Sequence, residues 1–232
     1  NQAVEDATQA IQADAYFVDA YACRATALAS QNKWRPAIDD HAQVIRLNPN
    51  VSAEYLNSVK KTVADALKDF DRQVAGGGNP QLFQDRGVAF ALINRHDRAV
   101  SEFTKSLKAA PDDIESHLFR AKSYAALDKP KQVISDCTFV LEKGRPSADA
   151  YFARGRAFAT LEKHKHAVAD LAKATKLDTS MVAAYHELGR VHETMSAVEA
   201  AIDAYSSGIK ANPYALNCYL SRGRLLANAN DH

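Results

Sequence analysis

The chain has 232 residues, of which 47% are hydrophobic and 25% charged, and its formal net charge is +1. These proportions are ordinary for a folded soluble protein, and a charge so close to zero gives no global field to attract nucleic acid or an anionic membrane. No apolar run approaches the roughly 20 residues that a membrane-spanning helix needs. The three cysteines are too far apart for a disulfide framework or a zinc motif. We expect no metal and no cofactor, and nothing in the sequence argues for secretion, which favours a cytoplasmic location.

The predicted elements repeat with a period of 34 residues. In chain order they are a lone helix at 1–15, a helix pair at 18–51, an irregular segment at 52–79, four helix pairs at 80–113, 114–147, 148–181 and 182–215, and a lone helix at 216–232. A small residue marks the first helix of each unit at Ala25, Gly87, Ala121, Gly155, Gly189 and Gly223. A second marks the other helix at Ala3, Ala37, Ala99, Val133, Ala167 and Ala201. Such residues are needed where two helices cross closely, so each unit is predicted to be an antiparallel hairpin.

The segment 52–79 interrupts this period, because it supplies 28 residues where a unit needs 34. Its apolar residues follow one helical stripe without an internal breaker, and three consecutive glycines end the stripe at Gly76. The segment is either one long helix, from about Ser52 to Val74, or a repeat that has lost its turn. The uninterrupted stripe favours the long helix.

An aromatic residue or histidine precedes each first small residue by four, as Tyr151 precedes Gly155, and proline closes several units, for example at Pro111. This pattern over 1–51 and 80–232 resembles the tetratricopeptide repeat family. The resemblance implies an all-α fold, a right-handed superhelical α-solenoid of antiparallel helix hairpins, whose first helices line a concave groove. The two lone terminal helices each match half a unit. They suggest either a longer array or self-assembly through uncapped ends.

Each hairpin is also predicted to contain an ion pair. Arginine precedes the first small residue in most units, and an acid follows that arginine by sixteen positions. The pairs are Arg24 with Asp40, Arg86 with Glu102, Arg120 with Asp136, and Arg154 with Asp170. In the unit 182–215 both charges are absent, since Leu188 and Ala204 stand in their places. If the two charges form a buried pair, both should be lost together, because a single buried charge without its partner destabilises the fold. Independent exposed charges are the alternative.

The groove implied by the resemblance carries basic and apolar side chains on successive first helices. The candidates for ligand binding are Leu118, Phe119, Lys122, Phe152, Arg156, His186, Arg190, Leu220 and Arg224. They read as a basic ladder beside an apolar strip, which would suit an extended and possibly acidic peptide. The alternative is that the arginines are paired locally, for example Arg190 with Glu187. The family's carboxylate clamp is missing, because residues such as Leu118 and Ala153 occupy its places.

No motif of catalysis is present: the sequence lacks a phosphate loop, a nucleophile elbow and a metalloprotease motif. We therefore expect a non-enzymatic scaffold that binds a protein or an extended peptide, with no nucleic acid and no membrane insertion. Two alternatives stay open. The chain could be the non-catalytic recruiting arm of a larger enzyme, or a module for homo-oligomeric assembly.

Overall fold

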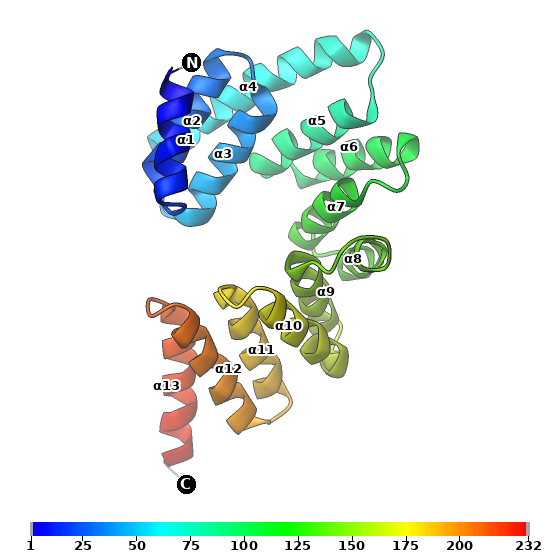
Figure 1. The fold of residues 1–232 in the computed structure, drawn as a ribbon. Helices are drawn as coiled ribbons and strands as arrows, with labels where there is room; N and C mark the ends of the chain where they lie inside the picture. The colour runs from blue at the N-terminus through cyan, green and yellow to red at the C-terminus, as the bar shows by residue number, and fades with distance from the viewer. Residues whose placement is uncertain (1, 231–232) are drawn as a thin grey trace. The chain divides into compact units, whose positions relative to one another are not determined.

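The computed structural model describes residues 2–230, and over that range it contains thirteen α-helices and no strand (Figure 1). The chain divides into two compact units, Asn1–Pro111 and Asp112–His232. Every helix in the described range is too short or too polar to cross a membrane. The fold is an all-α array of helical repeats, as the period predicted.

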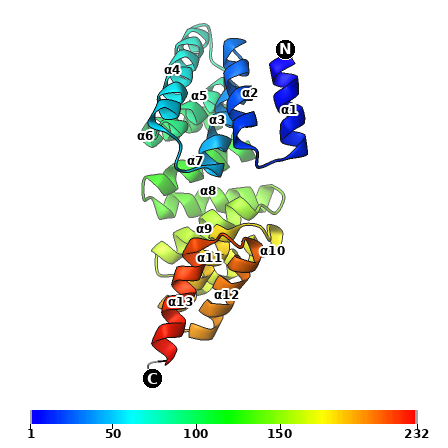
Figure 2. The ribbon, with the colours of Figure 1, turned by 90° about the vertical axis from the view of Figure 1, so that its left-hand side faces the viewer.

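The first unit contains six helices: α1 (Gln2–Ala13), α2 (Val18–Ser30), α3 (Trp34–Leu47), α4 (Ala53–Ala75), α5 (Pro80–Leu92) and α6 (His96–Ala109). Helices α2 and α3 form one hairpin, and α5 and α6 form another (Figure 2). Helix α1 packs on α2 as the second half of a hairpin would, while α4 packs against both α3 and α5.

The second unit contains α7 (Ile114–Ala126), α8 (Pro130–Lys143), α9 (Ala148–Thr160), α10 (His164–Leu177), α11 (Val182–Thr194), α12 (Val198–Ala211) and α13 (Leu216–Asn230). The first six of these form three successive hairpins, and α13 packs on α12. Helix α9 also contacts α7 and α11, so the first helices of neighbouring hairpins lie side by side.

Helix α4 is one continuous helix of 23 residues. Its start is capped by the Ser52 side chain, which accepts a hydrogen bond of 3.1 Å from the backbone N–H of Tyr55. Val59, Val63, Ala66 and Phe70 form its buried stripe, and the chain leaves the helix through Gly77, whose φ of 112° suits glycine. Of the two alternatives for this segment, the structure has the single long helix, because no helix-breaking residue interrupts the apolar stripe.

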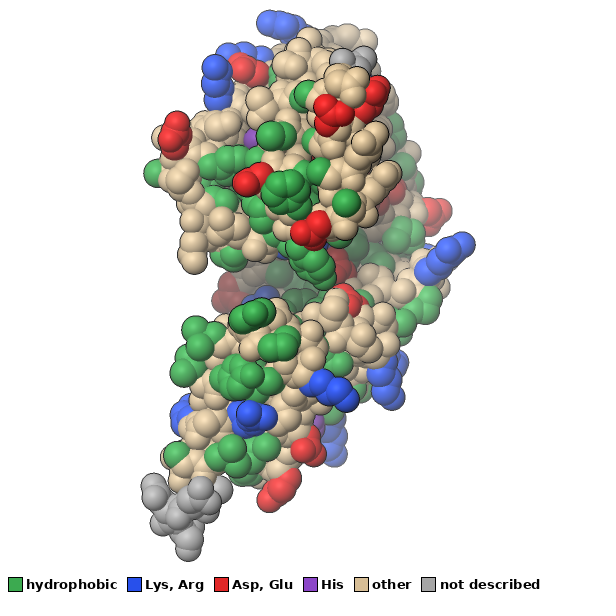
Figure 3. Space-filling view, turned by 60° about the vertical axis from the view of Figure 1, so that its left-hand side comes forward, with side chains coloured by type: hydrophobic (Ala, Val, Ile, Leu, Met, Phe, Trp, Pro, Cys, Tyr) green, Lys and Arg blue, Asp and Glu red, His purple; other side chains and the backbone are tan. Residues whose placement is uncertain are grey.

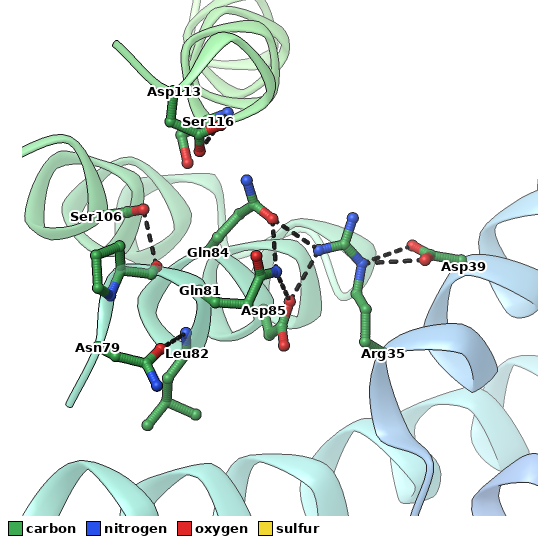
Figure 4. A network of polar contacts seen from close by, with 11 residues as sticks. Arg35, Asp39, Asn79, Gln81, Leu82, Gln84, Asp85, Ser106, Asp113 and Ser116 are labelled. Carbon is green, nitrogen blue, oxygen red and sulfur yellow. Dashed lines mark hydrogen bonds and ion pairs between the residues drawn. The ribbon is translucent and has the colours of Figure 1, made fainter. Parts of the chain in front are cut away.

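A polar network joins α3 to α5 beside this helix (Figure 4). The guanidinium of Arg35 in α3 donates to Asp85 at 2.9 Å and to the buried Gln84 at 3.1 Å, both in α5. The same side chain bonds Asp39 at 3.0 Å within α3. The indole N–H of Trp34, the residue before Arg35, donates to Asp69 of α4 at 2.9 Å. Helix α4 is therefore hydrogen-bonded to α3 as well as packed against it.

The hairpin turns share one backbone conformation. Two residues after the last residue of each first helix, φ is left-handed, between 52° and 59°, at Asn32, Asn94, Asp128, Glu162 and Ser196. The next backbone N–H then bonds the carbonyl five residues earlier, as Lys163 bonds Phe158 at 2.9 Å. This is the Schellman arrangement, which satisfies carbonyls that the helix end leaves open. Asparagine and aspartate tolerate this φ better than most residues, whereas Glu162 is strained there.

We expect Glu162→Gly to raise the free energy of unfolding by about 0.5–1 kcal/mol, since glycine removes the left-handed strain at a modest cost in chain entropy. Urea unfolding followed by circular dichroism measures the change. Glu162→Ala is the matched control, because it removes the same side chain but keeps the strain. Equal stabilisation by alanine and glycine would contradict this explanation.

The core of each hairpin depends on matched sizes at the helix crossing. The first small residue faces a residue sixteen positions later in the second helix. A Cβ added at Gly87 would lie 2.5 Å from the Phe103 ring, and one at Gly155 would lie 2.9 Å from Leu171. Gly189 faces Tyr205 in the same way. Where the first residue is alanine, at Ala25 and Ala121, the corresponding places hold His41 and Cys137.

The predicted ion pairs lie beside these crossings. Arg154 donates from Nε and a terminal nitrogen to both oxygens of Asp170, at 2.7 and 3.0 Å. Arg24 with Asp40 and Arg120 with Asp136 have the same two-bond geometry, at 2.7–2.9 Å. The carboxylates are almost fully buried. The side-chain hydrogen bond to Asp170 is the largest cause of the raised pKa of Arg154. These arginines are structural.

The fourth pair is looser than predicted. An Arg86 terminal nitrogen is 3.6 Å from Glu102 Oε2, and its other terminal nitrogen turns to Asp71 of α4 at 3.1 Å. The other Glu102 oxygen accepts from Lys105 at 2.7 Å. Glutamate is one methylene longer than aspartate, and α4 stands where a regular second helix would precede this hairpin, so both partners find other contacts.

The same arginines also bond backward along the array, which the sequence analysis missed. Arg24 donates to Thr8 at 3.2 Å, Arg154 to Thr138 at 3.0 Å, and Arg222 to Ser206 at 3.0 Å. Each hydroxyl lies sixteen positions before its arginine, on the second helix of the preceding hairpin. The guanidiniums of Arg24 and Arg154 therefore each join three helices, and that of Arg222 joins two. The hairpin of α11 and α12 lacks these bonds. Ala172, Leu188 and Ala204 stand where other hairpins have the hydroxyl, the arginine and the acid.

Candidate functional site

The predicted basic row lies on successive first helices of the second unit. Lys122, Arg156, Arg190 and Arg224 each follow the small residue at the helix crossing, on α7, α9, α11 and α13. Their side chains are 49%, 56%, 60% and 63% exposed. A ligand in solution can therefore reach all four.

Each basic group nevertheless has a carboxylate of the chain beside it. Lys122 bonds Asp149 of α9 at 2.6 Å, and Arg224 bonds Glu193 of α11 at 2.5 Å. Glu193 also accepts a very short hydrogen bond from the buried Tyr205 hydroxyl. The four basic groups are therefore not unpaired charges, because each lies near a carboxylate. In the space-filling view, acidic and basic side chains are interspersed on the face shown (Figure 3).

Arg156 and Arg190 differ from the other two because they share one carboxylate. Arg190 donates to both oxygens of Glu187 at 3.2 Å, while the Nε of Arg156 is 3.9 Å from the same group. The Glu187 side chain is only 17% exposed. Two cations against one anion leave a surplus positive charge at this point of the row.

A cavity of about 180 Å³ opens at this triad. Its walls come from α9, α10 and α11, and its lining residues are Arg156, Ala159, Thr160, His164, Glu187, Arg190, Val191 and Thr194. The hydroxyls of Thr160 and Thr194 donate to backbone carbonyls of their own helices, at 3.1 and 2.7 Å. Their lone pairs stay available, and the guanidinium groups supply donors, so the cavity can bind a polar group.

The predicted apolar strip is only partly present as a free surface. Phe152 is half-buried and packs against the cluster of Ala167, Leu171 and Val191, with Arg156 5.6 Å from its ring centroid. Leu118 and Phe119 are also half-buried. His186 lies 5.7 Å from the Tyr205 ring. Leu220, with 64% of its surface exposed, is the member that stands freely in solvent. Phe152 therefore contributes to packing between hairpins, and His186 to packing within its own hairpin.

Within the described residues, no group of three or more His, Cys, Asp or Glu side chains is placed to hold a metal ion. Burial is the main cause that raises the pKa of the Cys137 thiol, to about 12, so this cysteine is neutral at physiological pH. The sequence indicated the pairing of Arg190 with Glu187, since the two lie three positions apart on one helix face, but it did not indicate the approach of Arg156 to the same carboxylate. His164 and the two threonines carry no comparable signal, because only the packing of three helices brings them together.

The comparisons with known proteins agree with this architecture. Residues 148–180 match the model of the tetratricopeptide repeat. No curated protein matches the sequence. A crystal structure of MamA is 28% identical and covers 62% of this chain and 84% of its own, with a TM-score of 0.59. A second MamA structure is 27% identical over 65% and 82%, with a TM-score of 0.61.

A structure of YrrB, described as a tetratricopeptide repeat protein with an unusual peptide-binding site, covers 95% of this chain and 100% of its own. It is 17% identical, with a TM-score of 0.59, so the likeness concerns the fold. The sequence match over residues 148–180, and the same helix pairs in the other hairpins, make the chain similar to tetratricopeptide repeat proteins.

Proposed function

We propose that the chain is a protein-binding scaffold, and that the face formed by α7, α9, α11 and α13 holds an extended segment of a partner protein. The observation that carries this proposal is the cavity at Arg156 and Arg190, where two exposed guanidinium groups share one carboxylate. Hydrogen-bond donors and a surplus charge on successive helices are suited to binding rather than to catalysis.

The spacing of the first helices favours an extended ligand. Helices in contact lie about 8–10 Å apart, and an extended chain advances about 3.3 Å per residue. Three residues of the partner would therefore pass from one helix to the next. Side chains three positions apart could meet Arg156 on α9 and Arg190 on α11, while Leu220 on α13 offers apolar contact further along.

Charge supports a protein ligand more than a nucleic acid. Lys122 and Arg224 are each neutralised by a nearby carboxylate, so the face lacks the run of free cations that binds phosphate backbones. The surplus positive charge at Arg156 and Arg190 would steer and orient the ligand, and contacts to neutral groups would supply much of the affinity. Binding should weaken as salt screens this charge.

We expect the double change of Arg156 and Arg190 to glutamate to reduce affinity for a partner at least tenfold, because it replaces the surplus positive charge with three carboxylates. A peptide selected from a random displayed library by the unmodified chain serves as the ligand, and fluorescence anisotropy gives its Kd. The matched control reverses two exposed lysines on second helices, Lys176 and Lys210. Equal affinity in the double variant, with helicity and melting intact, would contradict the proposal.

A further inference from the structure

We infer that the cavity between α9 and α11 is a pocket for one carboxylate of the bound segment. Glu187 competes with that carboxylate for the same hydrogen-bond donors. This inference rests on the proposed scaffold function and narrows it, because it replaces a series of acidic contacts with a single one.

The donors that would hold the carboxylate are already in place. A guanidinium has five N–H donors. Within the described chain, that of Arg156 makes no hydrogen bond, since its nearest carboxylate oxygen is 3.9 Å away. Arg190 engages Glu187 through one terminal nitrogen. Both arginines line the cavity, and guanidinium groups bind carboxylates in paired hydrogen bonds.

The charge balance selects the ligand. Lys122 with Asp149 and Arg224 with Glu193 are pairs of opposite charge. Arg156, Arg190 and Glu187 together carry one excess positive charge. A carboxylate carries one negative charge and would neutralise this excess, whereas a phosphate carrying nearly two would leave the pocket negative. The pocket is therefore matched to a monoanion.

The size of the pocket agrees with such a group. A water molecule takes up about 30 Å³ in the liquid, so a cavity of about 180 Å³ has room for a carboxylate and the methylene groups that carry it. The apolar walls of Ala159 and Val191 suit those methylene groups. The carboxylate could belong to an acidic side chain or to the C-terminus of a partner, which share this chemistry.

Glu187 would act against the ligand. In the free protein it offsets the repulsion between the two arginines and engages the donors of Arg190. An incoming carboxylate must share those donors and approach a like charge. Removal of the Glu187 charge should therefore tighten binding. A merely structural carboxylate predicts the reverse, because the arginines would then separate and lose the ligand.

The test uses the full chain and small probes. N-acetylglutamate N-methylamide imitates an acidic side chain, and N-acetylglycine imitates a C-terminal carboxylate. Binding is followed by nuclear magnetic resonance, through the backbone amide signals of α9 and α11, which are present in every variant. We expect saturable shifts with at least one carboxylate probe and none with the neutral glutamine analogue. The probe that binds more tightly identifies the source of the carboxylate.

Variants then decide the role of Glu187. Glu187→Gln should lower the Kd of the carboxylate probe about threefold to fivefold, a small factor because Arg190, the partner of Glu187, is 60% exposed and solvent screens the pair. Glu142→Gln, an equal charge change at an exposed position of α8, should leave it unchanged. Joint replacement of Arg156 and Arg190 by glutamine should abolish the shifts. No shift in the unmodified chain, tighter binding of inorganic phosphate than of either carboxylate, or weaker binding by Glu187→Gln would each overturn the inference.

The outcome also separates this inference from the proposed function. If the probes bind as described but no library peptide does, the carboxylate pocket stands and the scaffold proposal fails. If peptides bind the groove equally well with and without an acidic residue or free C-terminus, the scaffold proposal stands and the pocket inference fails.

Discussion

Replacement of Gly87 by alanine is expected to lower the free energy of unfolding by about 2 kcal/mol, although alanine is the better helix former. The added methyl group would lie 2.5–2.8 Å from three atoms of the Phe103 ring. Phe103 is fully buried and its ring is rigid, so neighbouring side chains must move. Overpacking of this kind costs about 1–3 kcal/mol. Urea unfolding followed by circular dichroism at 222 nm measures the loss.

A second substitution separates this clash from other effects. Phe103→Cys, added to Gly87→Ala, recreates the combination of Ala121 and Cys137 in the hairpin of α7 and α8. We expect the double variant to be more stable than the sum of the single changes predicts, with a coupling of about 1–2 kcal/mol. Gly76→Ala, at a helix end where the nearest atom is 3.5 Å from the added Cβ, is the control. Additive changes would show that Phe103 does not cause the loss.

Arg154→Leu is expected to lower the free energy of unfolding by about 2 kcal/mol. It leaves Asp170, 6% exposed, without its two hydrogen bonds, and it frees the hydroxyl of Thr138. Breaking a fully buried pair costs about 3–5 kcal/mol, and the partial exposure of Arg154 reduces this figure. The same unfolding measurement applies.

The hairpin of α11 and α12 suggests how this loss can be recovered. It carries Leu188 and Ala204 in place of the pair, and Leu188 packs on the cluster of Leu171 and Val191. Arg154→Leu combined with Asp170→Ala copies that solution, so the double variant should regain most of the stability. If the double-mutant cycle gives no coupling energy, the pair contributes nothing as a pair.

The sequence predicted contacts within one hairpin far better than contacts between hairpins. Arg154 and Asp170 could be paired from their spacing, since a hairpin with a short turn fixes which residues meet. The long helix α4 followed from an uninterrupted apolar stripe. In contrast, Asp149 reaches Lys122 across 27 residues from another hairpin, and its approach depends on side-chain rotamers. The hydroxyls at Thr8, Thr138 and Ser206 did form a regular column, and their common spacing could have revealed the backward bonds.

The hairpin of α11 and α12 lacks the guanidinium hydrogen bonds that join other hairpins to their neighbours, and this affects how firmly it is held. Ala172, Leu188 and Ala204 leave the contact between the hairpin of α9 and α10 and that of α11 and α12 without the guanidinium bonds found elsewhere. Hydrogen bonds fix a direction, whereas apolar side chains can slide over one another at little cost. The same joint contains the cavity between Arg156 and Arg190. The charge surplus therefore lies at a joint that lacks these guanidinium bonds, and a ligand seated there would bridge two neighbouring repeats.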